Sequence, residues 1–241
     1  MKFYDLFGEK EDTLFYISLA KKYGRKALEL GVGTARLAIQ LARSGIDVWG
    51  IDNSRYMLKA AKEKISRLPK EVSKRIRLKY ADVRNFNLNE KFDLIYFPSF
   101  SFDHLLSYDD QCHALNSIRN HLALRGAYVF DLAQVSSNQD KDSWFVQHKQ
   151  LDDSQTVIRI GFRRVKPQKN LISIHLWYEL YEDGLLLERY HEGGDVYIHS
   201  IESIKQLLIN NGFEITALYG SYDWKPFTKS SNLMVIVSCL I

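Results

Sequence analysis

The stretch KALELGVGTARLAIQLARSGIDVWGID, residues 26–52, has the pattern of a strand, a glycine turn, a helix and a second strand. Its apolar run 27–30 is typical of a strand that is covered on both faces. Gly31 and Gly33 make a turn without side-chain bulk, where the backbone can approach a ligand closely. Asp52 ends the second strand, where a carboxylate can accept hydrogen bonds from ribose hydroxyls. The stretch therefore predicts a βαβ unit that binds a nucleotide.

The helix between these two strands is amphipathic. We expect Thr34 to cap its start and Gly45 to end it in the left-handed conformation. Its apolar residues recur at helical spacing and predict one face that packs on a sheet. These residues are Leu37, Ala38, Leu41 and Ala42.

Two residues of the turn distinguish between classes of nucleotide. The dinucleotide fingerprint has a small residue at its sixth position, whereas this turn has Arg36 there. Glu29 stands just before the first glycine, where it can meet a cationic amino group and would repel phosphates. Both departures favour a ligand that has a ribose and an ammonium group but no diphosphate.

The string ELGVGTARLAIQLARSGIDVWGIDNSRYMLKAA, residues 29–61, resembles the cofactor-binding motifs of class I S-adenosylmethionine-dependent methyltransferases. Their usual form is E/D-x-G-x-G-x-G, and Ala35 stands here in place of the third glycine. Residues 82–84, Asp-Val-Arg, resemble the Gly-Asp-Met-Arg segment of the same family. The cofactor implied is S-adenosyl-L-methionine, with S-adenosyl-L-homocysteine as its product. The cofactor-binding residues implied are Glu29, Gly31, Gly33, Asp52, Asn53, Met57, Asp82, Val83, Arg84 and Phe97.

The loop after the fourth predicted strand, 92–97, is expected to hold the chemistry, because ligands of open α/β sheets lie where the strand order reverses. In this family the reversal falls between the first and fourth strands. Methyltransferases of nucleobase amino groups have Asn or Asp at the start of this loop, whereas this chain has Phe97. That difference weighs against nucleic acid as the substrate.

Residues 103–106, Asp-His-Leu-Leu, resemble the Asn-His-Leu stretch of small-molecule methyltransferases. His104 is therefore the candidate catalytic residue, because histidine can take a proton from a nucleophile near neutral pH. A histidine that only bonds backbone is the alternative. Candidate substrate-binding residues are Tyr4, Phe100, Phe102 and Asp131.

Two of these candidates keep an open alternative. Tyr4 is either a lid over the cofactor, as the resemblance implies, or an aromatic residue that fills a surface groove. Asp131 ends the fifth strand, where it either binds a cationic amine substrate or accepts hydrogen bonds from loop amides.

The resemblance predicts a Rossmann-like seven-stranded sheet, mostly parallel, that ends in an antiparallel C-terminal hairpin. We expect this α/β domain to span residues 1–134 and 192–241. Residues 135–191 carry strand-type runs separated by turns and predict an antiparallel β insert after the fifth strand. Two roles are open for this insert, and they can coexist: covering the substrate cleft, or forming a homodimer.

Composition sets further limits. The formal net charge is only +4, which is too small to imply nucleic acid by itself. The two cysteines and seven histidines show no metal-ligand spacing, so no metal site is expected. No signal region and no apolar run of membrane-spanning length is seen, which favours a soluble cytoplasmic protein without a membrane partner.

The predicted function is transfer of a methyl group to an amine or hydroxyl of a small molecule by in-line displacement. Residues 55–79 contain ten cationic side chains, which are either a solvated face or a surface for RNA. The alternatives are accordingly an RNA or protein methyltransferase that uses this surface, and a non-catalytic nucleotide-binding module.

Overall fold

The structure is a computed structural model that describes residues 3–8, 11–134 and 142–241. The chain divides into two compact units. The larger unit contains Lys10–Gln134 and His199–Ile241, and the smaller unit contains Met1–Glu9 and Val135–Ile198.

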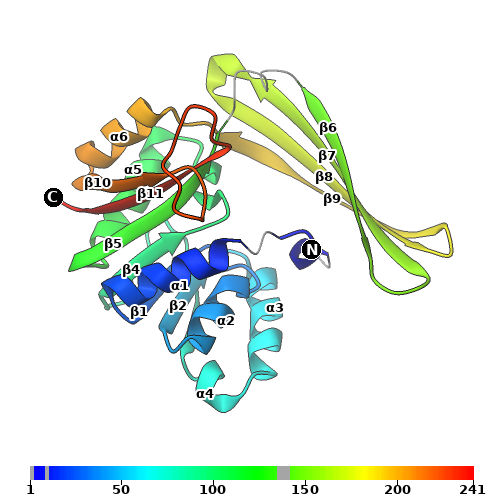
Figure 1. Ribbon diagram of the computed structural model, residues 1–241, viewed down its shortest axis with the longest axis horizontal. Coiled ribbons are helices and arrows are strands. Elements are labelled where there is room, and N and C mark those ends of the chain that lie inside the picture. Colours follow the sequence, from blue (N-terminus) through cyan, green and yellow to red (C-terminus); the bar gives the residue numbers. More distant parts are fainter. Residues whose placement is uncertain (1–2, 9–10, 135–141) are drawn as a thin grey trace. The chain divides into compact units, whose positions relative to one another are not determined.

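A seven-stranded sheet forms the centre of the larger unit, in the order β10-β11-β5-β4-β1-β2-β3 (Figure 1). Strands β1 to β5 pair in parallel, whereas β11 runs antiparallel to both β5 and β10. The strand order reverses between β1 and β4, so the predicted fold class is confirmed. The strands are β1 (Lys26–Leu30), β2 (Asp47–Asp52), β3 (Ile76–Tyr80), β4 (Phe92–Phe97), β5 (Leu122–Ala133), β10 (Phe213–Tyr219) and β11 (Leu233–Leu240).

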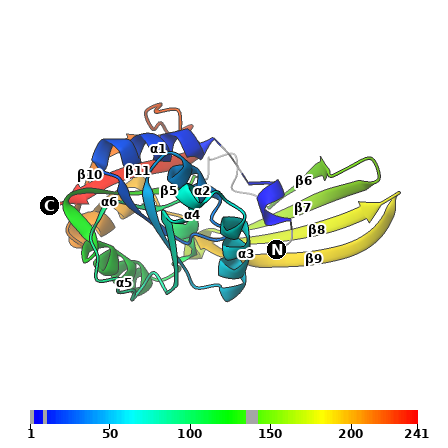
Figure 2. The ribbon, with the colours of Figure 1, turned by 90° about the horizontal axis from the view of Figure 1, so that it is seen from below.

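Helices cover both faces of this sheet, and Figure 2 shows α1 on one side and α5 on the other. One hydrophobic core lies under α1, α2 and α3, and a second lies under α5 and α6. Successive residues of β1 alternate between the two cores, with Ala27 in the first and Leu28 in the second. The helices are α1 (Asp12–Tyr23), α2 (Arg36–Arg43), α3 (Arg55–Ser66), α4 (Lys70–Ser73), α5 (Tyr108–Arg119) and α6 (Ile201–Asn210).

The start of α2 differs from the prediction. Its predicted apolar face is buried, and Gly45 follows its end with a φ of +85° as expected. Thr34, however, does not cap the helix. The N-cap is Ala35, which is itself left-handed with a φ of +63° and donates its N–H to the Val32 carbonyl. The turn therefore closes through its backbone, one residue later than a threonine cap would place the helix.

The smaller unit contains a four-stranded antiparallel sheet in the order β6-β7-β8-β9, as predicted for the insert. Its strands are β6 (Ser143–Gln150), β7 (Gln155–Lys166), β8 (Leu171–Glu182) and β9 (Leu185–Tyr197). It also contains two short 3₁₀ helices, η1 (Tyr4–Leu6) and η4 (Pro167–Lys169). Phe3 and Phe7 pack against Val157, Tyr178 and Leu180 on one face of this sheet.

Candidate active site

The glycine turn after β1 has the conformation that only glycine adopts without strain. Gly31 has a φ of +64° and Gly33 a φ of +52°. A Cβ on Gly31 would lie 3.2 Å from Cε2 of Phe97 and 3.6 Å from Oγ of Ser101. The first glycine is thus required both by its backbone angle and by the close approach of the loop that follows β4.

Asp52 connects this turn to the start of α3. Its Oδ2 accepts the N–H of Gly33 at 2.8 Å, and its Oδ1 accepts the N–H of Ser54 at 2.7 Å. The side chain remains partly exposed at the carboxyl end of β2. Asn53 beside it is exposed, and Met57 is buried in the first turn of α3, where Ser54 is the N-cap.

Asp82 follows β3 and lies at the same edge of the sheet, because the Ala81 N–H bonds the Asp52 carbonyl at 3.1 Å. The Asp82 carboxylate accepts two side-chain hydrogen bonds from Arg84, at 2.9 and 2.6 Å. These bonds lower the pKa of Asp82. Arg84 also pairs with Asp110 at 3.1 Å, so two carboxylates engage its guanidinium. Val83, between Asp82 and Arg84 in the sequence, is half-buried.

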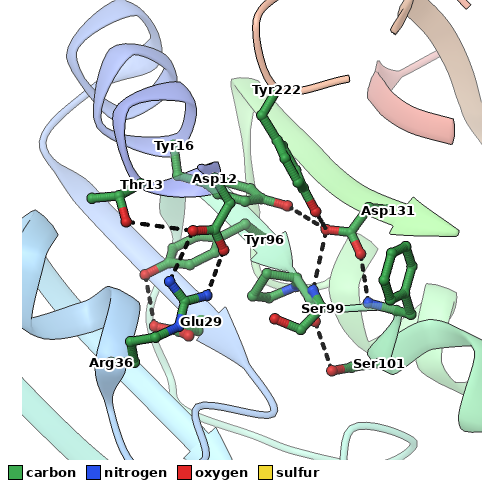
Figure 3. A network of polar contacts seen from close by, with 12 residues as sticks. Asp12, Thr13, Tyr16, Glu29, Arg36, Tyr96, Ser99, Ser101, Asp131 and Tyr222 are labelled. Atoms are coloured by element: carbon green, nitrogen blue, oxygen red, sulfur yellow. Dashed lines mark hydrogen bonds and ion pairs between the residues drawn. The ribbon is translucent and has the colours of Figure 1, made fainter. Parts of the chain in front are cut away.

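Arg36, the residue that departs from the dinucleotide fingerprint, forms a bidentate pair with Asp12 of α1, at 2.8 and 2.5 Å (Figure 3). Glu29 lies below this pair and accepts the hydroxyl of Tyr96 at 3.0 Å. Glu29 is buried, and its burial raises its pKa to about 8. Its carboxyl group is therefore largely protonated at neutral pH and is held towards Tyr96.

The loop between β4 and the turn η2 (Ser101–His104) is fastened to Asp131 at the end region of β5. The fully buried carboxylate of Asp131 accepts the N–H of Ser99 at 3.2 Å and that of Phe100 at 2.5 Å. The hydroxyls of Tyr16 and Tyr222 each donate to Oδ2 at 3.0 Å (Figure 3). Of the two roles considered for Asp131, the structure thus shows the bonding of loop amides.

Phe102 was expected to bind the substrate, but its side chain lies in the hydrophobic core. Its side chain is fully buried and contacts the rings of Phe97 and Phe130, at centroid distances of 6.3 and 5.0 Å. The residue is thus an anchor for η2 in the core. Phe100 is half-buried, and His104 is exposed at the end of η2. The side chain of Tyr4 lies outside the described part of the structure.

Asp103 is a buried acid in this loop that the sequence does not indicate. Its Oδ2 accepts the N–H of Ala133 at 2.9 Å, and its buried Oδ1 has no hydrogen-bond partner among the described residues. Burial raises its pKa to about 8. Only its position beside His104 could have pointed to it, because the sequence does not show that the side chain turns inward.

Other features lie away from this edge. A cavity of about 500 Å³ is lined by residues such as Lys91 and His121, which precede β4 and β5 and so mark the opposite edge of the sheet. Within the described ranges, no group of three or more His, Cys, Asp or Glu residues could hold a metal ion. No helix in these ranges is long and apolar enough to cross a membrane.

The basic segment 55–79 makes contacts within the larger unit. Arg75 pairs with Asp47 at 2.7 Å, and Arg55 lies over the ring of Tyr80 at 4.3 Å. Lys79 donates to the Asn87 carbonyl at 2.7 Å. These three cationic side chains are thus engaged by other residues of the larger unit.

Known proteins share this fold. Residues 27–126 match the family model described as a methyltransferase domain. The cypemycin N-terminal methyltransferase of Streptomyces sp is 25% identical, over 89% of this chain and 82% of that protein. Among solved structures, the CcbJ methyltransferase of Streptomyces caelestis superposes with a TM-score of 0.82 at 19% identity, covering 97% of each chain. CalS10 of Micromonospora echinaspora, an amino pentose methyltransferase solved with S-adenosylmethionine bound, has a TM-score of 0.74 at 18% identity and covers 97% of this chain and 94% of its own.

The glycine turn and the acids at the ends of β2 and β3 all lie within the residues that the family model matches. The resemblance predicted from residues 29–61 is thereby confirmed. Residues 27–126 of this chain are thus a methyltransferase domain, and its fold is the one that solved S-adenosylmethionine-dependent methyltransferases share.

Proposed function

We propose that this chain transfers a methyl group from S-adenosylmethionine to an amine or hydroxyl group of a small molecule. The observation that carries the proposal is the meeting of the glycine turn with the loop after β4, where Gly31 approaches Phe97 and Ser101. The apolar Phe97 at the start of this loop leaves out the acceptor that a flipped nucleobase requires. The amino pentose methyltransferase that shares the fold supports a small amine as the acceptor.

The residues at the carboxyl edge fit the cofactor in two respects. The left-handed turn at Gly31 and Gly33 leaves backbone without side chains where a ligand must approach. Asp52 offers a partly exposed carboxylate to the ribose hydroxyls. Asn53, Met57, Asp82 and Val83 follow the two neighbouring strands and are proposed to surround the adenosine, whereas the guanidinium of Arg84 is engaged by Asp82 and Asp110.

The cofactor supplies a methyl group on a positively charged sulfur, and the leaving group is a neutral thioether. The chain therefore has no leaving atom to activate, and its contribution is to position the acceptor and exclude water. Positioning can lower a barrier by about 7–11 kcal/mol. His104 on η2 is proposed to take the proton from the attacking group, and the half-buried ring of Phe100 is proposed to contact the acceptor.

The first test is binding and turnover. Calorimetric titration with S-adenosylhomocysteine should show binding, and a methyl-labelled cofactor should transfer its label to members of pooled small amines and alcohols. The proposal fails if S-adenosylhomocysteine does not bind at millimolar concentration, or if only RNA or protein takes up the label.

The second test concerns His104. The variant His104→Ala should lose about 10²–10⁴-fold in turnover, the range typical of a general base. Its affinity for S-adenosylhomocysteine should stay unchanged. The matched control is His113→Ala, which removes an exposed histidine from α5. Equal turnover in the two variants would remove His104 from the proposed mechanism.

The insert at residues 135–191 is proposed either to cover the cleft or to form a homodimer. Two stacked tryptophans on the sheet face opposite Phe3 support the homodimer. Trp144 is 65% exposed and stacks on Trp177 at a centroid distance of 5.9 Å. Sedimentation of the purified chain and of Trp144→Ser tests it. A monomeric wild type would reject the dimer.

A further inference from the structure

The loop after β4 and the end of β5 bind each other through two carboxylates. Each segment supplies one carboxylate, which accepts backbone N–H groups of the other segment. Asp131 of β5 accepts the N–H groups of Ser99 and Phe100 in the loop. Asp103 of the same loop accepts the N–H of Ala133, two residues beyond Asp131. The loop after β4 and the end of β5 are therefore joined at both ends by buried acids (Figure 3 shows the Asp131 end).

The loop needs such an anchor because of its backbone. Ser99 has a φ of +61° and Phe100 a φ of +58°, so two consecutive residues with side chains adopt the left-handed conformation. L residues disfavour this conformation, and it persists only where the surroundings hold it in place. Both N–H groups of the strained pair are bound by the one carboxylate of Asp131, and at 2.5 Å the bond from Phe100 is the shorter.

The remaining acceptor capacity of Asp131 is used by other parts of the fold. Tyr16 comes from α1, and Tyr222 comes from the segment between β10 and β11. Tyr16 and Tyr222 are the titratable groups that bond Asp131, and its charge also raises the pKa values of Asp103 in η2 and Tyr128 in β5. Within the described residues, the pKa of Asp131 is set by its burial and by the hydrogen bonds that it accepts, with no cationic side chain among these causes. Four donors on a fully buried carboxylate make it a part of the scaffold.

We propose that Asp131 is a positioning residue for methyl transfer, which holds Ser99 and Phe100 in their strained conformation and thereby fixes η2 with His104. This proposal rests on the proposed function, since it assigns the loop to the acceptor side. The ionised carboxylate can accept from both amides and both hydroxyls, whereas the protonated acid loses its charge and turns one oxygen into a donor. Protonation therefore weakens the hold on the loop.

The protonation step lies in an accessible range. Burial raises the pKa of Asp131 to about 6, and the hydrogen bonds from Phe100, Tyr16 and Tyr222 oppose that rise. The amide proton signal of Phe100 in a ¹H–¹⁵N spectrum reports this bond directly. It should move upfield as the pH falls through about 6 in the wild-type chain.

Two variants test whether the carboxylate of Asp131 holds the loop. Tyr222→Phe removes one donor that stabilises the carboxylate, so the midpoint of the Phe100 signal should shift to higher pH. Asp131→Asn should abolish the midpoint and shift the Phe100 signal at every pH. Where Asp131→Asn does not fold, Tyr222→Phe alone decides. A flat Phe100 signal between pH 5 and 8 in the wild type, or an unshifted midpoint in Tyr222→Phe, overturns the proposal.

Turnover separates this proposal from the proposed function. Once an acceptor is found, Asp131→Asn should lower kcat at least tenfold, while its affinity for S-adenosylhomocysteine stays within about threefold. The spectra need no acceptor. A titrating Phe100 signal in a chain that does not bind S-adenosylhomocysteine would reject the function and leave the anchor in place, whereas binding with a flat Phe100 signal would reject the anchor alone.

Discussion

Replacing Glu29 by glutamine should change how the stability of the chain depends on pH. Burial raises the pKa of Glu29 from 4.5 to about 8. The folded state then binds the proton more tightly than the unfolded state, so stability falls as the pH rises from 4.5 towards 8. The slope is about 1.4 kcal/mol per pH unit for one such group, which gives about 3 kcal/mol between pH 5 and pH 7. Glutamine lacks this loss, and its carbonyl can still accept the hydroxyl of Tyr96.

The assay is urea unfolding of both proteins at pH 5, 6, 7 and 8. The difference in the free energy of unfolding between Glu29→Gln and wild type should rise by about 3 kcal/mol from pH 5 to pH 7 in favour of the variant. Asp103 and Asp131 titrate with the same sign but are present in both proteins, so they cancel in the difference. Glu63→Gln, on the exposed side of α3, is the control and should give a flat difference. A flat difference for Glu29→Gln as well would mean that Arg36 keeps this carboxylate ionised, and it would refute the raised pKa of Glu29.

Three further variants test the site. Gly31→Ala should lose about 1–2 kcal/mol of stability and, by calorimetry, bind S-adenosylhomocysteine at least tenfold more weakly. The control is Gly45→Ala, at a position that is also left-handed but has open space around it. It should lose stability without losing affinity. Asp52→Asn should weaken S-adenosylhomocysteine about tenfold to a hundredfold, as expected when a charged acceptor is removed, and unchanged affinity would remove Asp52 from the site. Phe102→Ala should lower the free energy of unfolding in urea by about 3–5 kcal/mol, because this ring is buried in the core. A loss below 1 kcal/mol would contradict a core role for this ring.

The sequence predicted those parts of the fold that depend on near neighbours. The turn from Gly31 to Asp52 has its glycines, its helix period and its acid within one βαβ unit, and the strand order followed from the family that this unit resembles. Asp131 depends on Tyr16 and Tyr222, which are 115 and 91 positions away in the chain. Nothing in local periodicity indicates such partners. The burial of Phe102 and Asp103 could not be predicted either, because these residues lie in a short loop where the sequence has no periodic pattern that indicates which side chains point inward.

The cluster around the glycine turn accounts for the arginine at the sixth position. Arg36 and Asp12 neutralise each other through two hydrogen bonds, so the pair leaves little positive charge for Glu29 beside it. Burial is the largest influence on Glu29, and Arg36 only partly offsets it, which is why the carboxyl group keeps its proton near neutral pH. A buried acid in this state has a reason to ionise only when a new positive charge arrives. An ammonium group bound at the turn would be such a charge, so we expect a ligand that carries one to lower the pKa of Glu29.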